Sequence, residues 1–540
     1  MTVKSPEVVV VAIAAAALAL VMTWPLAIHL GSRGRVDTAD GRFSIWNVAW
    51  VAHALVTDPR HVFDANIFYP HKDTLAYSEN NLGAGVLAAP VYRLTRNPFA
   101  AHNFAVLSGF VLSALGMYCL VRLLTGNRAA AAIAGICFAF TPYVFAHSAH
   151  IQLQMTAGLP FSMFFFHRLA ARISIGRGAA LGAAMAATAI FCGYYGVFVI
   201  LMVGYASLVV AAARGWWTNL AYWRALAAGA VVSIAVVSPA FLPYLSIQQN
   251  DGFRRQLDDA RPYSANWSDY LASPSNLHSG MLPYLPPWTE VTFPGFIATG
   301  LGVASLWVAR KRFGGELFAI YGGLIVLAAW ASFGPAGGLY AWLYRALPLF
   351  TWLRAPARLG LIVVMGMAAL TGLSVAAILD RVRSRAAVAI ALGLLAIAEL
   401  KVSSNLREVE PFDPVYRTLA TLPPGPVVEL PFYYVRGMFP LHTQYMLNST
   451  THWMPLVNGY SDHIPQDFFD NVMTLAPFPT PAGMKLLEPG HVRYAVFHLG
   501  GYIPENRRDV ETRLKQLEDY FRPLYVSENT RLYEIVAYPR

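Results

Sequence analysis

Long apolar runs alternate with short polar connections over residues 1–402 of the chain. A helix needs roughly twenty apolar residues to cross a membrane. The pattern therefore predicts a polytopic α-helical membrane protein with about eleven transmembrane helices. The predicted spans are 8–30, 104–124, 129–147, 156–172, 178–195, 196–213, 225–245, 293–309, 316–334, 357–379 and 386–402.

The apolar run 179–213 is too long for one span, and Gly193 and Gly196 fall inside it. Glycine weakens a helix and permits a tight turn, so we expect two helices that separate there. Arginine supports this split, because cytoplasmic connections are rich in Lys and Arg. With a cytoplasmic N-terminus, every predicted inner connection is basic; these connections hold Arg122 and Arg128, Arg168, Arg172 and Arg177, Arg214 and Arg224, Arg310, Lys311 and Arg312, and Arg381, Arg383 and Arg385.

This topology describes a multi-pass protein of the cytoplasmic (inner) membrane whose long polar segments are extracytoplasmic. We expect a transmembrane domain over residues 1–402, which includes a first extracytoplasmic loop at 31–101 with interfacial helices. Phe43, Trp46, Trp50 and Ala54 recur at helical spacing in that loop. Since Trp is typical of the membrane interface, the stretch is expected to lie along the membrane surface.

Residues 403–540 differ in composition and predict a small C-terminal extracytoplasmic α/β domain. Val427–Leu430 and 492–499 have the pattern of strands, and 510–521 has a helical period. The segments 524–527 and 531–536 predict a hairpin around Glu528 and Asn529.

Composition agrees with a membrane protein, because 56% of the residues are hydrophobic and only 13% are charged. The net charge of +10 comes from basic residues scattered between apolar runs, which excludes a nucleic-acid-binding face. Cys119, Cys137 and Cys192 all fall inside apolar runs, so no disulfide is expected in the polar segments.

Asp37 and Asp40 lie just beyond the first span, at the depth expected of lipid headgroups. A carboxylate at this place can accept a proton from a hydroxyl as a general base, or it can hold a divalent metal. The alternative is a solvated turn in which the aspartates cap the next helix.

Arg354 and Arg358 lie at the outer start of the tenth predicted span, on either side of Pro356. If a helix begins near Pro356, the two side chains share one helical face. Guanidinium groups bind phosphate through paired N–H donors, so the pair suits a lipid phosphate. The alternative is an anchor that reaches anionic lipid headgroups.

His147 and His150 fall in the outer turn between the third and fourth spans, close to the bilayer. Polar residues at this depth often belong to a binding site, although the spacing of two histidines is a weak metal signal. The alternative is that they are polar residues of a turn. Glu79, in the first polar segment, either assists Asp40 or caps the following helix.

No phosphate-binding loop, dinucleotide fingerprint, zinc-protease motif or nucleophilic serine elbow is present in the sequence. The chain resembles the GT-C superfamily of integral membrane glycosyltransferases. The resemblance rests on the layout and on three segments: Asp40-Gly41 followed by Trp46, then 66–70 (Asn-Ile-Phe-Tyr-Pro), and 353–358 (Leu-Arg-Ala-Pro-Ala-Arg). These segments are similar to bacterial members, some grouped as YfhO-like proteins.

The resemblance implies that a sugar on a polyprenyl phosphate is transferred to an acceptor hydroxyl of a glycan, a lipid or a protein at the outer face. In that family an acidic residue of the first outer loop is the base, which points to Asp40 first and Asp37 second. Arg354 and Arg358 would bind the lipid phosphate. Some members use a divalent metal such as Mg²⁺ or Mn²⁺; Asp37 and Asp40 are three residues apart rather than adjacent, which leaves the metal open.

Two other functions fit the layout. A transporter or lipid flippase would have broken helices and polar residues near the middle of the membrane. A non-catalytic envelope assembly protein would use its outer domain to capture a partner. Membrane lipids are partners in every case.

Overall fold

The computed structural model describes residues 5–252 and 255–539, and it divides the chain into two compact units. The membrane unit comprises Met1–His29 and Phe104–Asn405, and the polar unit comprises Leu30–Asn103 and Leu406–Arg540. This division differs from the domains expected from the sequence. The first polar segment groups with the C-terminal region rather than with the apolar helices that flank it.

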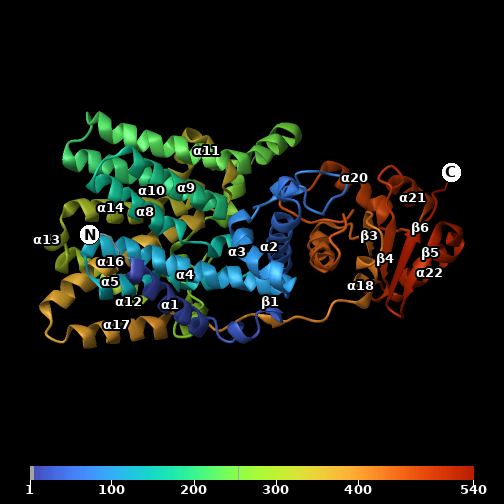
Figure 1. Ribbon diagram of the computed structural model, residues 1–540, viewed down its shortest axis with the longest axis horizontal. Helices are drawn as coiled ribbons and strands as arrows, with labels where there is room; N and C mark the ends of the chain where they lie inside the picture. The colour runs from blue at the N-terminus through green and yellow to red at the C-terminus, as the bar shows by residue number, and fades with distance from the viewer. Residues whose placement is uncertain (1–4, 253–254, 540) are drawn as a thin grey trace. The chain divides into compact units, whose positions relative to one another are not determined.

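The membrane unit is built almost entirely of helices (Figure 1). Their bounds are α1 (Ser5–Met22), α4 (Pro98–Thr125, which begins in the polar unit), α5 (Arg128–Ala139), α6 (Pro142–Ala146), α7 (Ile151–Gln154), α8 (Gly158–Ala171), α9 (Ile175–Phe191), α10 (Gly193–Arg214), α11 (Leu220–Asp251), α12 (Phe296–Val308), α13 (Arg310–Phe313), α14 (Gly315–Ser332), α15 (Leu339–Ala346), α16 (Gly360–Arg381) and α17 (Arg385–Leu400).

Each predicted span overlaps a helix, although α1 ends at Met22 and the span 129–147 is divided between α5 and α6; the expected split in 179–213 is confirmed. The helices separate at Cys192, which has extended backbone one residue before Gly193. Among the described residues, 7 helical segments are long and apolar enough to cross a membrane, and α9 and α12 are shorter apolar helices. The chain is therefore a polytopic helical membrane protein, while the number of spans stays a prediction.

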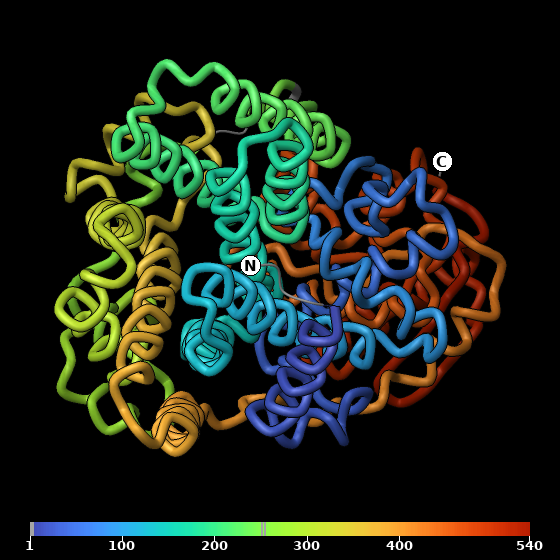
Figure 2. The backbone as a smooth tube through the Cα atoms, turned by 60° about the vertical axis from the view of Figure 1, so that its left-hand side comes forward, coloured from blue at the N-terminus to red at the C-terminus, as the bar shows by residue number. Residues whose placement is uncertain are grey.

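Helix α16 forms the centre of the membrane unit, where it packs against α5, α12 and α14 (Figure 2). In the most apolar stretch of Pro356–Leu379, 89% of the residues are buried inside the protein, against 11% in Leu220–Gln249. Helix α11 instead exposes apolar side chains such as Val231 and Ile234. Such a surface is stable only in contact with lipid or another apolar partner.

Small residues bring α9 and α11 into close contact. A Cβ atom added to Gly182 would lie 2.1 Å from the carbonyl oxygen of Gly229, and one added to Gly178 would lie 1.9 Å from that of Ala225. Small residues four apart are typical of closely packed membrane helices, because they let the two backbones approach each other.

The polar unit is a mixture of helices and strands. Its elements are β1 (Arg33–Gly34), α2 (Ala39–Thr57), α3 (Leu82–Thr95), β2 (Arg407–Glu408), α18 (Pro414–Ala420), β3 (Val427–Leu430), α19 (His442–Asn448), α20 (Gln466–Leu475), α21 (Pro481–Leu487), β4 (Tyr494–His498), α22 (Pro504–Gln516), β5 (Phe521–Val526) and β6 (Thr530–Ile535). The small C-terminal α/β fold predicted from the sequence is thus confirmed.

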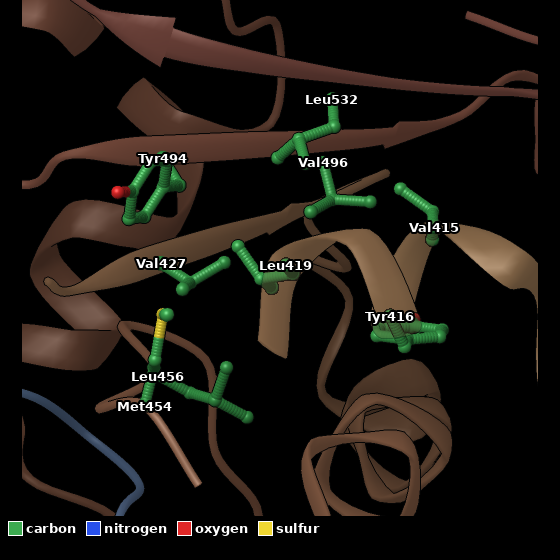
Figure 3. Close-up of a cluster of buried hydrophobic side chains, with 9 residues drawn as sticks. All are labelled: Val415, Tyr416, Leu419, Val427, Met454, Leu456, Tyr494, Val496 and Leu532. Atoms are coloured by element: carbon green, nitrogen blue, oxygen red, sulfur yellow. The ribbon is translucent and has the colours of Figure 1, made fainter. Parts of the chain in front are cut away.

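The four-stranded sheet of the polar unit has the order β3-β4-β6-β5. Strands β3 and β4 are parallel, and the remaining pairs are antiparallel. One face of the sheet is covered by α18, because Val415 and Leu419 are fully buried against Val427, Val496 and Leu532 (Figure 3).

The segment 66–70 joins the first polar segment to the C-terminal part of the polar unit. The N–H of Phe68 donates to the carbonyl of Asn458 (3.1 Å), and that of Tyr69 donates to the carbonyl of Leu456 (2.8 Å). A Cβ added to Gly459 would lie 2.7 Å from the ring of Phe68, so this position needs glycine. The segment therefore has a structural role within the unit.

Trp46 and Trp50 of helix α2 pack inside the polar unit, and a position of this helix along the membrane surface stays a prediction. Trp46 is only 1% exposed, and its indole N–H donates to the side chain of Asn66 (3.1 Å). Trp50 contacts Trp453 with ring centroids 5.6 Å apart. Helices α3 and α19 of the same unit bury the apolar face of α2. Packing inside the unit therefore explains the helical spacing of its tryptophans.

Candidate functional site

Arg354 and Arg358 do not share a helical face as expected. Residues Pro356–Leu359 form a 3-10 turn that leads into α16, and Arg354 precedes this turn. The guanidinium of Arg354 lies over the ring of Tyr263, 5.2 Å from its centroid. That of Arg358 lies over Tyr194 at 4.7 Å. Each arginine is therefore held by an aromatic face.

Tyr194 connects the two arginines. The backbone N–H of Arg354 donates to the hydroxyl of Tyr194 (3.2 Å), whose ring carries the guanidinium of Arg358. Tyr194 lies in the first turn of α10, directly after the break at Cys192. The interruption between α9 and α10 thus positions a side chain of the candidate site.

Arg358 is half-buried, yet its guanidinium forms no ion pair or hydrogen bond with any residue that the structure describes. A cation removed from water is normally paired, because its desolvation is costly. The N–H donors of Arg358 are therefore available to an anion, and phosphate suits their forked geometry.

His147 forms an ion pair with Glu290, in which Nε2 lies 3.2 Å from Oε1. Its Nδ1 faces the carbonyl of Tyr143 at 2.8 Å. Both ring nitrogens of His147 therefore face acceptor oxygens. His150 contacts His147 edge to face, with ring centroids 6.4 Å apart. The two histidines predicted from the sequence are brought together, with Glu290 as an additional member.

Opposing effects determine the pKa of the Glu290 carboxyl. Burial raises this pKa, but His147, the N–H of Val291 (2.9 Å from Oε1) and the charge of Arg358 lower it. The net result is a pKa below its usual value, so Glu290 is ionised at neutral pH. The membrane unit therefore holds a buried carboxylate within the field of Arg358.

Asp40 lies in the polar unit, in the first turn of α2, where its side chain is exposed. Thr38 caps this helix by accepting a hydrogen bond from the N–H of Gly41 (3.1 Å). A Cβ at Gly41 would lie 1.9 Å from the carbonyl oxygen of Arg35, so only glycine fits after Asp40. Since Thr38 is the capping residue, Asp40 is not needed as the cap.

Asp37 is engaged by a basic neighbour. Its carboxylate accepts from Nε of Arg35 at 2.9 Å. The positive charge of Arg42 also interacts with Asp37, and Arg42 is fixed by bonds to Val36 (2.7 Å) and Thr443 (3.1 Å).

Glu79 is half-buried in the polar unit, and its backbone carbonyl accepts from the side chains of Asn47 (3.1 Å) and Asn81 (3.4 Å). The residue at the N-cap of α3 is Asn81. A role of Glu79 at the start of α3 stays a prediction. A role beside Asp40 stays a prediction.

A divalent metal is not supported by the donor set. Among the residues 5–252 and 255–539, no group of three or more His, Cys, Asp or Glu side chains is suited to hold a metal ion. Asp37 is committed to Arg35. We therefore derive no chemical step through a metal.

Comparisons with known proteins show which solved structures this architecture resembles. The chain matches no protein-family model, and no curated protein is significantly similar to it. Among solved structures, it is similar to ArnT from Cupriavidus metallidurans bound to undecaprenyl phosphate, with TM-score 0.50 and 15% identity over 97% of this chain and 98% of ArnT. It is also similar to the archaeal oligosaccharyltransferase AglB from Archaeoglobus fulgidus, in complex with an inhibitory peptide and a dolichol-phosphate. That match has TM-score 0.50 and 12% identity over 96% of this chain and 72% of AglB.

The chain has the GT-C fold. This confirms the superfamily resemblance of the sequence at the level of fold, while the likeness to YfhO-like members stays a prediction. The roles of Asp40, Asp37, Arg354, Arg358, His147, His150 and Glu79 also stay predictions, because a fold at such low identity assigns no site residue.

Sequence reasoning missed Glu290 and Tyr194 as members of the candidate site. Glu290 is the only acidic residue between Asp269 and Glu316. A lone carboxylate in an apolar stretch of a GT-C fold is a usable signal. Tyr194 lies in the Gly193–Gly196 turn that the sequence identified as a helix break, but nothing in the sequence connects it to Arg358.

Proposed function

We propose that this chain is a glycosyltransferase of the cytoplasmic membrane, which transfers a sugar from a polyprenyl-phosphate donor to an acceptor hydroxyl at the outer face. The observation that carries the proposal is Arg358, a half-buried guanidinium that lies over Tyr194 and forms no ion pair or hydrogen bond with the described residues. In a membrane protein of GT-C fold, a lipid-linked phosphate is the anion that this arrangement suits best.

The lipids in the similar structures support this donor. The ArnT structure contains undecaprenyl phosphate, and the AglB structure contains a dolichol-phosphate. Both are polyprenyl phosphates, which combine an apolar chain with one phosphate group. The charge of +10 and the basic connections support the orientation, because they fit a cytoplasmic N-terminus and extracytoplasmic polar segments.

In this proposal, named residues carry the separate steps of the transfer. Asp40 takes the proton of the acceptor hydroxyl, and the hydroxyl oxygen attacks the anomeric carbon of the sugar. The bond from that carbon to the phosphate oxygen breaks, and polyprenyl phosphate leaves with the electron pair. Arg358 and Arg354 stabilise the negative charge that grows on the phosphate. Proton, sugar and leaving group are thereby accounted for without a further reactant.

The test uses purified full-length protein, radiolabelled polyprenyl-phosphate sugars and a membrane extract as the source of acceptor. We expect label to move into a new product with the wild type and transfer to fall by more than 10²-fold in Asp40→Asn, the usual range for loss of a general base. Asp58→Asn is the matched control, since Asp58 lies at the other end of α2 and is also exposed.

Two results would count against the proposal. Equal transfer by wild type and Asp40→Asn would exclude Asp40 as the base. Movement of the lipid-linked sugar across a vesicle membrane without a new glycosidic bond would indicate a transporter instead. Folding of each variant is checked by its elution as a single species.

A further inference from the structure

A second group of polar side chains lies in the polar unit, where the parallel strands β3 and β4 end. Glu429 of β3 is fully buried, and His498 is the last residue of β4. Nε2 of His498 lies 2.6 Å from Oε2 of Glu429, and Tyr416 places its hydroxyl 3.2 Å from the same oxygen. Ligands of α/β proteins commonly bind at the carboxyl ends of parallel strands.

His498 is also part of a column of stacked rings. Neighbouring rings have centroids 6.0, 5.3, 6.0 and 6.1 Å apart and interplanar angles of 15°, 15°, 29° and 7°, in the order Tyr433, Tyr445, His498, Tyr416 and His452. The stack and Glu429 together fix the orientation of the imidazole. The unit thereby orders a histidine whose second nitrogen takes no part in this network.

Two atoms of this network have no hydrogen-bond partner among the described residues. Nε2 of His498 faces Glu429, so Nδ1 is the nitrogen left for another molecule, and it bonds to no residue that the structure describes. The side chain of His498 is 20% exposed, so a molecule from solvent can reach it. Oε1 of Glu429 is buried and also has no partner within the described residues. A buried acceptor without a donor is rare in proteins and calls for an explanation.

The chain that follows β3 exposes apolar side chains. Tyr434, Val435, Met438 and Leu441 are all at least 40% exposed. Tyr433, which stacks on Tyr445, immediately precedes this segment. A ligand for this place must donate hydrogen bonds and also cover apolar and aromatic side chains. The Glu429 carboxylate disfavours an anionic ligand, since it would face a like charge.

We propose that the polar unit binds a neutral carbohydrate at this edge, with a sugar hydroxyl donating to Nδ1 of His498 and the apolar face of the sugar lying against Tyr434. Glu429 is a positioning residue, because it holds His498 with Nδ1 directed away from the carboxylate. A sugar offers hydroxyl groups that donate hydrogen bonds and an apolar face of C–H groups. The polar unit offers unpartnered polar atoms and exposed apolar side chains, so the two are complementary. All residues of this site belong to the polar unit.

The test measures carbohydrate binding by the full-length protein in lipid nanodiscs free of sugar-based detergents. Saturation-transfer NMR is recorded with the methyl glycosides of glucose, galactose and mannose and with their disaccharides. We expect transfer to at least one probe by the wild type. Glu429→Gln should weaken its affinity by more than tenfold, and Glu429→Asp should restore part of it, because a carboxylate again accepts from His498.

Tyr434→Ala guards against a loss of folding, since Tyr434 is exposed and its replacement should weaken binding without unfolding the unit. Glu505→Gln is the control, because Glu505 is an exposed carboxylate on α22 of the same unit and should leave affinity unchanged. Arg358→Ala should bind the probes like the wild type, which separates this site from the donor site. The proposal is overturned if folded wild type binds none of the probes, or if Glu429→Gln and Tyr434→Ala bind them with wild-type affinity.

Discussion

The guanidinium of Arg358 lies 4.7 Å from the ring centroid of Tyr194, and it forms no ion pair or hydrogen bond with any residue that the structure describes. Tyr194 begins the helix that follows the break at Cys192, so an interruption of the apolar run determines where the arginine is held. An arginine that is held by an aromatic ring keeps all its N–H donors for a ligand.

Replacement of Arg358 should weaken binding of the lipid-phosphate donor, and alanine should weaken it more than lysine. Arg358→Lys keeps the charge but loses the planar fork and most of the stacking on Tyr194, while Arg358→Ala loses both. A charge-assisted hydrogen bond contributes roughly 1.5–3 kcal/mol, so we expect Arg358→Ala to weaken binding of a polyprenyl phosphate by about 10- to 100-fold. The affinity of Arg358→Lys for the lipid should lie between the affinities of the wild type and of Arg358→Ala. Binding is measured with purified protein and undecaprenyl phosphate.

Arg310→Lys is the matched control, because Arg310 is an exposed arginine of the same unit and should bind the lipid as the wild type does. If Arg358→Ala binds undecaprenyl phosphate with wild-type affinity, the anion site lies elsewhere.

Glu290→Gln should lower the stability of the protein at neutral pH, because it removes the charge that faces His147. A hydrogen bond to a charged partner contributes roughly 1.5–3 kcal/mol. The folded-state pKa of Glu290 is depressed, so its contribution is present above the unfolded-state pKa and is lost as the pH falls through the lower folded-state value. The melting temperatures of the wild type and Glu290→Gln should therefore converge in acid.

Equal pH profiles of the melting temperature for the two proteins would argue against this role of Glu290. Glu410→Gln is the control, because Glu410 is exposed.

Local patterns in the sequence predicted many elements of both units. Val427–Leu430 is a strand as predicted, and the hairpin around Glu528 and Asn529 is formed by β5 and β6. The break in 179–213 was displaced by only a few residues. These features depend on the spacing of apolar residues and on glycine, which are properties of neighbouring positions in the chain.

The candidate site was harder to predict because it depends on contacts between distant segments. Glu290 reaches His147 only through the folded bundle, and no spacing in the sequence connects them. The tryptophans of α2 gave a helical period that suits a membrane surface or a protein interior equally well. The burial of Trp46 by the polar unit selects the interior.

The buried His442 should make the polar unit less stable in acid. Burial lowers the pKa of His442 to about 4 from the usual value of 6.5, and its ring accepts from Asn458 at 3.2 Å in the neutral form. The unfolded chain then binds the proton at a higher pH than the folded chain, so stability falls as the pH decreases from about 6.5 to 4. This shift is equivalent to roughly 3 kcal/mol.

Thermal unfolding between pH 4 and 7 measures the effect of His442. We expect a flatter pH profile for His442→Gln than for the wild type, even if its melting temperature is lower throughout. His61→Gln is the control, because the imidazole of His61 is 63% exposed and its replacement should leave the slope unchanged. An equally steep profile in His442→Gln would assign the acid sensitivity to other groups.

The close contact of α9 and α11 should not tolerate a larger side chain at Gly182. A Cβ at this position would lie 2.1 Å from the carbonyl oxygen of Gly229, which belongs to a backbone that cannot move aside without shifting the helix. Overpacking of a tight interior costs about 1–3 kcal/mol, and displacement of two helices adds to this. We expect Gly182→Val to lower the melting temperature and the yield of folded protein. Gly204→Val on α10 is the control, since a Cβ there meets nothing within 4 Å. Because both variants place valine within a helix, a similar loss in the two would show that helix propensity rather than the α9–α11 contact causes it.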